Sequence, residues 1–119
     1  MQTYILVLED DPILGKVAIE AAKQAGVLAL LDNNGNQYPE FFREHGFPKA
    51  ILLDLHLPFA SGSELLKEFR ADEHLQGVPI FIMTADILRA RTMQEQGEQV
   101  LLKPVSPMRL QEILSRIEG

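Results

Sequence analysis

The sequence predicts an α/β fold, a doubly wound five-stranded parallel sheet built from five βα units. Short continuous apolar runs, typical of strands buried on both faces, alternate along the chain with segments whose apolar residues recur at helical spacing. A closed barrel of eight such units takes about 250 residues. The 119 residues therefore favour an open sheet within a single domain, residues 1–119.

Five apolar runs are the predicted strands. Their continuous rather than alternating apolarity favours parallel pairing. Because β-crossover-β connections are right-handed, the expected arrangement is the flavodoxin-like strand order 2-1-3-4-5, with a crevice between strands 1 and 3. The runs are Tyr4–Leu8, Val27–Leu31, Ala50–Leu53, Val78–Met83 and Val100–Leu102.

Each predicted strand is followed by a helix with recognisable end signals. Asp11 can cap a first helix that begins at Pro12, and Gly26 can end this helix after Ala25. The polar segment Asp32–Asn36 has turn chemistry and is predicted to be a surface loop. The remaining predicted helices are Pro39–His45, Ser63–Ala71 with Ser61 or Ser63 as its cap, Asp86–Gln96, and Met108–Ile117 after Ser106-Pro107.

Carboxylates stand where two predicted strands stop. Glu9 and Asp10 follow the first strand, and Asp54 follows the third. The carboxyl ends of neighbouring parallel strands meet in one crevice, so these acids are expected to converge. Like charges at close range raise each other's pKa unless a cation joins them, which favours a divalent metal site. Asp11 is interpreted as a helix cap outside this set.

Two further polar residues end the remaining strands. Thr84 closes the fourth and Lys103 the fifth. Alone, each has an ordinary explanation, a strand or cap threonine and a solvated lysine, but their joint placement with the acids favours a functional site. A hydroxyl, an ammonium group and carboxylates around one crevice suit a phosphoryl group with Mg²⁺. Asp54, at the centre, is the candidate nucleophile for an aspartyl-phosphate.

With these residues the chain resembles a response-regulator receiver domain, the CheY-like phosphoacceptor module of two-component signalling. The resemblance covers essentially the whole chain. Its motifs are Ile5-Leu6-Val7-Leu8-Glu9-Asp10-Asp11-Pro12, Leu52-Leu53-Asp54-Leu55-His56-Leu57-Pro58 with Gly62 following, Ile82-Met83-Thr84-Ala85 and Leu102-Lys103-Pro104.

The resemblance implies that Asp54 becomes a 4-aspartylphosphate, with a sensor histidine kinase or a phosphotransfer protein as the donor. It implies that Mg²⁺ is bound by Asp10, Asp54 and the main-chain carbonyl of His56, with Glu9 acting through water. Thr84 would be the switch hydroxyl and Lys103 the phosphate-binding lysine. The only implied catalysis is Mg²⁺-dependent self-phosphorylation and dephosphorylation, and the switch would control an output domain or partner protein, with a homodimer among the expected assemblies.

The resemblance also marks positions that set the rate and the readout. The side chains of His56 and Asp86 match positions that tune how fast the phosphoryl group is lost. Val100 stands where receivers usually carry the Tyr or Phe that rotates inward when the threonine moves. The segment Asp86–Glu98 is shorter than is usual in the family by nearly a helical turn, so the fourth helix or the loop after it should be reduced. The phosphorylation chemistry is therefore expected to be ordinary and the readout unusual.

Three other functions fit parts of the same sequence pattern. An aspartate-nucleophile phosphohydrolase would use the same residues, but it needs a second acid two residues after the nucleophile, where this chain has His56. A flavin binder needs a hydroxyl- and glycine-rich loop after the first strand, where Glu9-Asp10-Asp11 would repel a phosphate. A receiver-shaped interaction module that is never phosphorylated is kept open by Val100.

The composition narrows the function classes further. The net charge is −6 and the basic residues are scattered, which argues against direct nucleic-acid binding. No apolar run approaches the roughly 20 residues that a membrane span needs. The chain has no cysteine and no visible export signal, and both features fit a cytoplasmic location.

Overall fold

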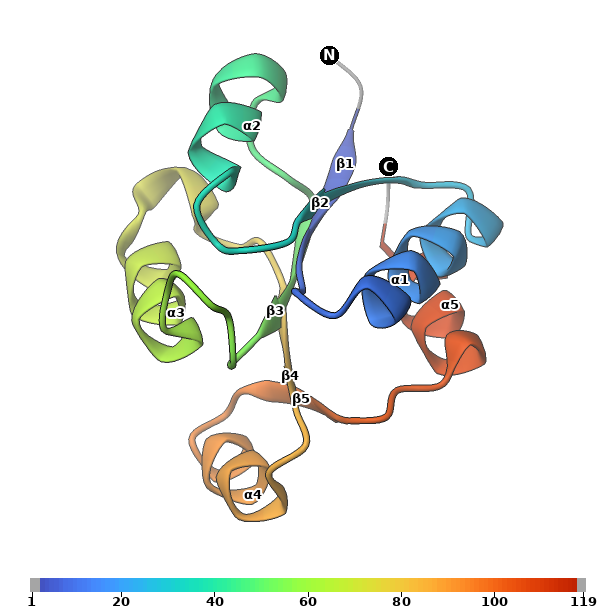
Figure 1. Ribbon diagram of the computed structural model, residues 1–119. Coiled ribbons are helices and arrows are strands. Elements are labelled where there is room, and N and C mark those ends of the chain that lie inside the picture. Colours follow the sequence, from blue (N-terminus) through green and yellow to red (C-terminus); the bar gives the residue numbers. More distant parts are fainter. Residues whose placement is uncertain (1–2, 118–119) are drawn as a thin grey trace.

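Five parallel strands form one sheet in the order β2-β1-β3-β4-β5 in the computed structural model, which describes residues 3–117. This confirms the predicted fold class and strand order. Figure 1 looks almost along the strands, so that the sheet runs down the centre of the molecule. The strands are β1 (Tyr4–Leu8), β2 (Leu28–Asp32), β3 (Ala50–Asp54), β4 (Ile80–Thr84) and β5 (Gln99–Leu102).

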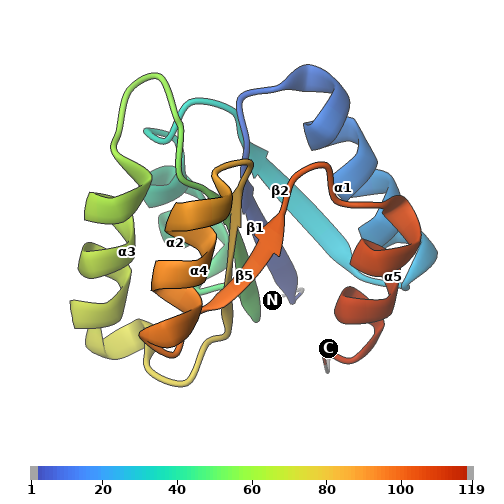
Figure 2. The same ribbon diagram turned by 90° about the horizontal axis from the view of Figure 1, so that it is seen from below.

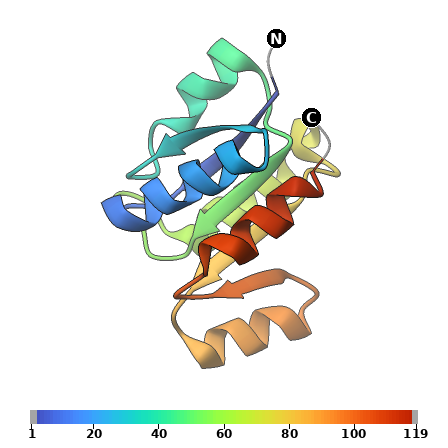
Figure 3. The same cartoon turned by 90° about the vertical axis from the view of Figure 1, so that its right-hand side faces the viewer.

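Helices cover both faces of the sheet. One face carries α1 and α5, which lie across it side by side in Figure 3, and the other carries α2, α3 and α4 (Figures 1 and 2). None of the helices in the described part of the chain has the length and apolarity to cross a bilayer. The helices are α1 (Pro12–Gln24), α2 (Tyr38–His45), α3 (Gly62–Ala71), α4 (Ile87–Glu95) and α5 (Pro107–Ser115), with a short 3-10 helix at Glu73–Leu75.

Side-chain caps define where four of the helices begin. The oxygens of Asp11, Ser61, Asp86 and Ser106 each accept a hydrogen bond from a backbone N–H two or three residues ahead. Such a bond satisfies one of the four N–H groups that a helix leaves without a partner at its start. The caps predicted at Asp11 and Ser106 are confirmed, and Ser61 rather than Ser63 caps α3.

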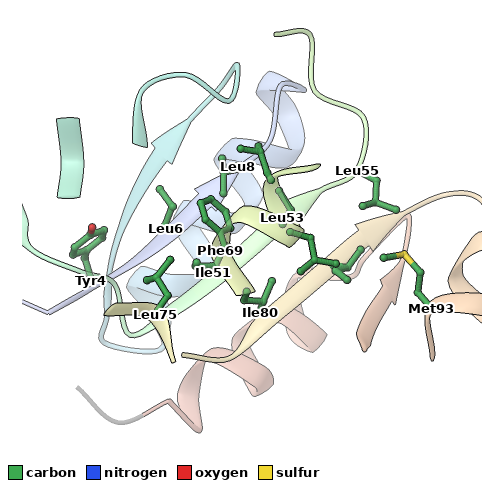
Figure 4. Close-up of a cluster of buried hydrophobic side chains, with 13 residues drawn as sticks. Tyr4, Leu6, Leu8, Ile51, Leu53, Leu55, Phe69, Leu75, Ile80 and Met93 are labelled. Atoms are coloured by element: carbon green, nitrogen blue, oxygen red, sulfur yellow. The ribbon is translucent and has the colours of Figure 1, made fainter. Parts of the chain in front are cut away.

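The core consists of two apolar layers, one on each face of the sheet. The layer beneath α2, α3 and α4 includes Leu6, Leu53 and Phe69 (Figure 4). The layer beneath α1 and α5 includes Ala18 and Leu114. All residues of β1 and β3 are buried, as expected for strands with helices on both sides. Side chains at the carboxyl ends of these two strands therefore emerge from a fully packed part of the sheet.

Two predicted strands begin too early. β2 starts at Leu28 because the Val27 N–H still bonds the Ala22 carbonyl at the end of α1. β4 starts at Ile80 because the Val78 N–H closes a turn onto the Leu75 carbonyl. Both boundaries depend on a backbone hydrogen bond that apolarity does not reveal.

Asp32 corrects the prediction of a surface loop at residues 32–36. It is the last residue of β2 and is fully buried. Its Oδ1 accepts hydrogen bonds from the N–H groups of Asn34 and Gly35, and its Oδ2 from those of Gln37 and Tyr38, at 2.7–3.2 Å. Four backbone donors compensate the burial of this carboxylate. Asp32 therefore organises the loop and the start of α2.

Candidate phosphoryl-transfer site

The carboxyl ends of the parallel strands bring the predicted polar residues to one edge of the sheet. Asp54 is the last residue of β3 and Thr84 the last of β4, while Glu9 directly follows β1 and Lys103 directly follows β5. The residues directly before these positions are apolar in every case, so the sheet itself fixes where each polar side chain emerges. The structure thus brings together residues that are up to 94 positions apart in the sequence.

Three carboxylates form an acidic cluster at this edge. One oxygen from each of Glu9, Asp10 and Asp54 lies within 4.8 Å of the others. Glu9 and Asp54 are each 2% exposed, whereas Asp10 is open to solvent. Burial and mutual repulsion both oppose the charged state, so such a cluster needs a cation. Its oxygen donors are the ligands that Mg²⁺ prefers, and the cluster fits that ion.

Lys103 supplies a positive charge from within the chain. Its Nζ lies 2.8 Å from Glu9 Oε1 and 3.1 Å from Asp54 Oδ2. Burial alone would lower the pKa of Lys103, but its hydrogen bonds to Glu9 and Asp54 raise it above the ordinary value. Lys103 therefore stays protonated and bridges the two buried carboxylates.

The buried surroundings of the cluster raise the pKa of Glu9. Burial, together with the hydrogen bond to Asp54 and the charge of Asp54, raises the pKa of Glu9 from 4.5 to about 7 against the opposing effect of Lys103. A cation that entered the cluster would favour the charged carboxylates and lower this pKa. The protonation state of Glu9, next to the candidate nucleophile, should therefore depend on both pH and metal binding.

Backbone amides orient the two buried carboxylates. The His56 N–H donates to Asp54 Oδ1 at 3.0 Å, and the Asp11 N–H donates to Glu9 Oε2 at 3.2 Å. Each carboxylate therefore has one oxygen on a backbone amide and the other on Lys103. The side chain of His56 is exposed. The roles expected for its main-chain carbonyl and its side chain stay predictions.

Thr84 connects the site to α4. Its hydroxyl is fully buried and accepts a hydrogen bond from the Asp86 N–H at 3.1 Å, and Asp86 in turn caps α4. Its carbonyl accepts from the Lys103 N–H at 2.8 Å. A displacement of Thr84 would therefore move the start of α4 and the backbone that carries Lys103.

Gly62 allows α3 to approach the strand end closely. A Cβ at this position would lie 2.4 Å from Leu55 Cα and 2.6 Å from the Asp54 carbonyl oxygen, closer than real Cβ contacts allow. The Gly62 N–H also bonds the Leu55 carbonyl at 3.2 Å. Only glycine fits here, which explains why it follows the Asp54 motif.

One residue at the mouth of the site was missed by the sequence analysis. Arg89, in the first turn of α4, lines a cavity of about 660 Å³ together with Asp10 and His56. Its guanidinium donates a hydrogen bond to Ser63 Oγ on α3. The sequence shows only that a cation lies in the first helical turn after Thr84. Its hydrogen bond to Ser63, 26 positions earlier in the chain, could be identified only from the structure.

Comparisons with known sequences agree with this geometry. A family model described as the response regulator receiver domain matches residues 5–115. The polar-differentiation response regulator DivK of Brucella anthropi is 28% identical over 122 residues, which cover 100% of this chain and 98% of DivK. The transcriptional regulatory protein BaeR of Escherichia coli is 32% identical over 117 residues, which cover 96% of this chain and 46% of BaeR. The chain thus spans about half the length of BaeR.

Solved structures give the same result. The chemotaxis response regulator CheY4 of Vibrio cholerae superposes with a TM-score of 0.81 at 20% identity, covering 99% of this chain and 100% of CheY4, and supports the fold. The receiver domain of the sensor histidine kinase PA1611 from Pseudomonas aeruginosa, solved with a magnesium ion in its active-site cleft, has a TM-score of 0.79 at 31% identity and covers 98% of both chains. This chain belongs to the response regulator receiver domain family.

Proposed function

We propose that this chain is a phosphorelay switch in which Asp54 accepts a phosphoryl group from a histidine kinase or a phosphotransfer protein. Receiver domains are signalling switches of two-component systems rather than classical enzymes. The observation that carries the proposal is the buried Asp54 carboxylate, held between a backbone amide and Lys103 inside the acidic cluster. This arrangement orients a carboxylate nucleophile and provides a cation for the group that it receives.

Mg²⁺ is the cofactor of the proposed switch. Asp10, Asp54 and the main-chain carbonyl of His56 would hold it, with Glu9 acting through water, and the donor set of the cluster fits this assignment. When bound, Mg²⁺ reduces the repulsion between the phosphoryl oxygens and the carboxylates. The magnesium ion in the active-site cleft of the PA1611 receiver domain supports the assignment.

The transfer itself needs little from the protein beyond position and charge. An Asp54 carboxylate oxygen attacks the phosphorus of a phosphohistidine, a P–O bond forms as the P–N bond breaks, and the donor imidazole takes a proton from solvent. Lys103 exchanges its contact with Asp54 Oδ2 for one with a phosphoryl oxygen. The Lys103–Glu9 contact at 2.8 Å keeps the ammonium group in place meanwhile.

The switch would act through Thr84. Phosphorylation adds about −1.5 to −2 charges beside the cluster. The Thr84 hydroxyl, which now accepts from the Asp86 N–H, would turn to donate to a phosphoryl oxygen. Since Asp86 caps α4, this change loosens the start of that helix. With Val100 in place of an aromatic ring, the bistable element is the segment from Thr84 into α4.

Exposed apolar side chains around the site support a protein as the phosphoryl donor. Ile13, Leu88 and Met108 lie in the first turns of α1, α4 and α5, and Phe59 lies in the loop between β3 and α3, each at least 70% exposed. These segments all follow strand ends, so they surround the acidic cluster. A rim of this kind suits docking of a protein surface better than that of a small substrate.

The proposal includes further associations. An output domain or a partner protein would read the switch, a homodimer is an expected assembly, and direct nucleic-acid binding is not expected from the net charge of −6. Residues 1–119 would act as one receiver domain in the cytoplasm. Light scattering with and without phosphorylation, and fractionation of cells that produce the protein, test the assembly and the location.

Intact mass spectrometry tests the proposed chemistry. We expect incubation with acetyl phosphate and Mg²⁺ to add one labile phosphoryl group to the protein and none to an Asp54→Asn variant. Omission of Mg²⁺ should suppress the adduct in the unsubstituted protein. An adduct of equal size on the variant, no adduct on either protein, or rapid multiple turnover of phosphate esters would each contradict the proposal.

A further inference from the structure

Residues of α3 and α4 line a groove of about 690 Å³. Both helices lie on the opposite side of the sheet from α1 and α5 (Figure 2). Leu66 of α3 and Met93 of α4 are among its lining residues, and both are largely buried and apolar. The hydrogen bond from Arg89 to Ser63 Oγ joins the two walls near their N-terminal ends. The groove therefore has an apolar floor between two helical walls.

Cations line this groove. Lys67 and Arg70 of α3 and Arg89 of α4 contribute three positive charges, and Glu98 is the only acid in its lining. Glu98 pairs with Arg70 at 2.6 Å, whereas Lys67 and Arg89 have no carboxylate within 4.0 Å among residues 3–117. Three cations and one acid leave a local charge of +2 on a chain whose net charge is −6.

The cations of α3 face the groove. Ser63, Lys67 and Arg70 recur at helical spacing along the side that lines the groove. Glu68 instead points toward α2, where its carboxylate accepts a hydrogen bond from the Tyr38 hydroxyl at 3.2 Å. The remaining acid of α3, Glu64 in its first turn, is exposed and does not line the groove. The groove wall that α3 supplies therefore carries cations and no acid.

We propose that the α3–α4 groove is a docking site for an acidic, amphipathic segment of a partner protein. The apolar floor would take the apolar side chains of the segment, and Lys67 and Arg89 would take its carboxylates. The 10 residues of α3 offer a wall of about 15 Å, which matches a short segment. A nucleic acid or an anionic membrane needs a broad basic surface, and the acidic remainder of this chain repels both.

Arg89 connects the groove with the acidic cluster. It lines the groove and also the cavity shared by Asp10 and His56. A phosphoryl group on Asp54 would compete with the acidic segment for this guanidinium, so phosphorylation would weaken docking. This coupling rests on the proposed function, whereas docking to the unphosphorylated protein does not.

Fluorescence anisotropy with a synthetic probe tests the docking site. The probe is a short fluorescein-labelled peptide with glutamates on both sides of a leucine stripe, and its control carries glutamine in place of glutamate. We expect the first peptide to bind the unphosphorylated protein and Lys67→Glu to weaken binding about tenfold. Lys16→Glu, an exposed change on α1, should leave the affinity within about twofold of the unsubstituted protein. Amide shifts in NMR spectra should concentrate on α3 and α4.

The same assay separates this inference from the proposed function. Lys67→Glu should still be phosphorylated by acetyl phosphate, and Asp54→Asn should still bind the peptide. Phosphorylation of the unsubstituted protein should weaken peptide binding severalfold. Absence of binding, equal binding of the glutamine peptide, an equal loss in Lys16→Glu, or preferential binding of duplex DNA or anionic vesicles would overturn the docking site. Unchanged affinity on phosphorylation would overturn its coupling to Asp54.

Discussion

The acidic cluster and the region of α4 and β5 differ in how deeply their residues are buried. At the cluster, β3 is buried along its whole length and Lys103 joins Glu9 and Asp54, which are each 2% exposed. At the edge of the sheet, Gln99 and Leu102 of β5 are exposed, and the Arg70–Glu98 pair is partly open to solvent. The central strand is fully buried, whereas the edge strand is partly open to solvent, so we expect substitutions in the second region to be tolerated more easily.

Substitution of glycine should destabilise the two regions to different extents. In Gly62→Ala the new Cβ would collide with Leu55 Cα at 2.4 Å, and we expect a loss of about 3 kcal/mol in the free energy of unfolding. Gly97, between α4 and β5, has φ +90° and open space around it, so Gly97→Ala should cost only about 1–2 kcal/mol. Urea denaturation measures both, and equal losses would contradict the tight approach at Gly62.

Removal of a cation should also separate the two regions. Lys103→Met leaves Glu9 and Asp54 buried without a positive charge, and we expect a loss of about 3 kcal/mol at pH 8 in the absence of Mg²⁺. Arg70→Met breaks a pair whose arginine side chain is 47% exposed and should cost less than about 1 kcal/mol. Added Mg²⁺ should restore part of the first loss only. A larger loss in Arg70→Met would reverse the comparison.

The pH dependence of stability should come from the cluster. Burial raises the pKa of Glu9 from 4.5 to about 7, so between these values the folded protein keeps a proton that the unfolded chain releases. The free energy of unfolding should therefore fall as pH rises from 4.5 to 7, by about 3 kcal/mol in the presence of EDTA. Glu9→Gln should remove most of this decline, and a decline of the same size in the variant would argue against Glu9 as its source.

The site residues at the strand ends were predictable from the sequence, whereas contacts that form only on folding were not. Glu9, Asp54, Thr84 and Lys103 could be placed from the sequence because each ends a continuous apolar run and parallel strands bring such ends to one edge. The burial of Asp32 could not be predicted, because the four backbone N–H groups that bond its carboxylate reach it only once the loop is folded. Ion pairs between side chains of different strand ends, such as Lys103–Glu9, likewise could be identified only from the structure.

The smallest effect is expected at Val100, which lies opposite Ile82 in the β4–β5 pairing and is only partly buried. Val100→Tyr should change the free energy of unfolding by less than about 1 kcal/mol, because a partly exposed edge position can accommodate the ring. The rate of Asp54 phosphorylation by acetyl phosphate should stay within about twofold, since the cluster is complete without the ring. A rate change above tenfold would show that the two regions are strongly coupled.

Chemical mapping of the phosphoryl group tests the role of Asp54 most directly. Borohydride reduces an acyl phosphate to an alcohol, so treatment of the phosphorylated protein should convert the modified aspartate to homoserine. After proteolysis and tandem mass spectrometry, we expect homoserine at position 54, dependent on both acetyl phosphate and Mg²⁺. Homoserine at Asp10 or Asp11 with none at position 54, or no conversion at all, would contradict the assignment of Asp54 as the phosphoacceptor.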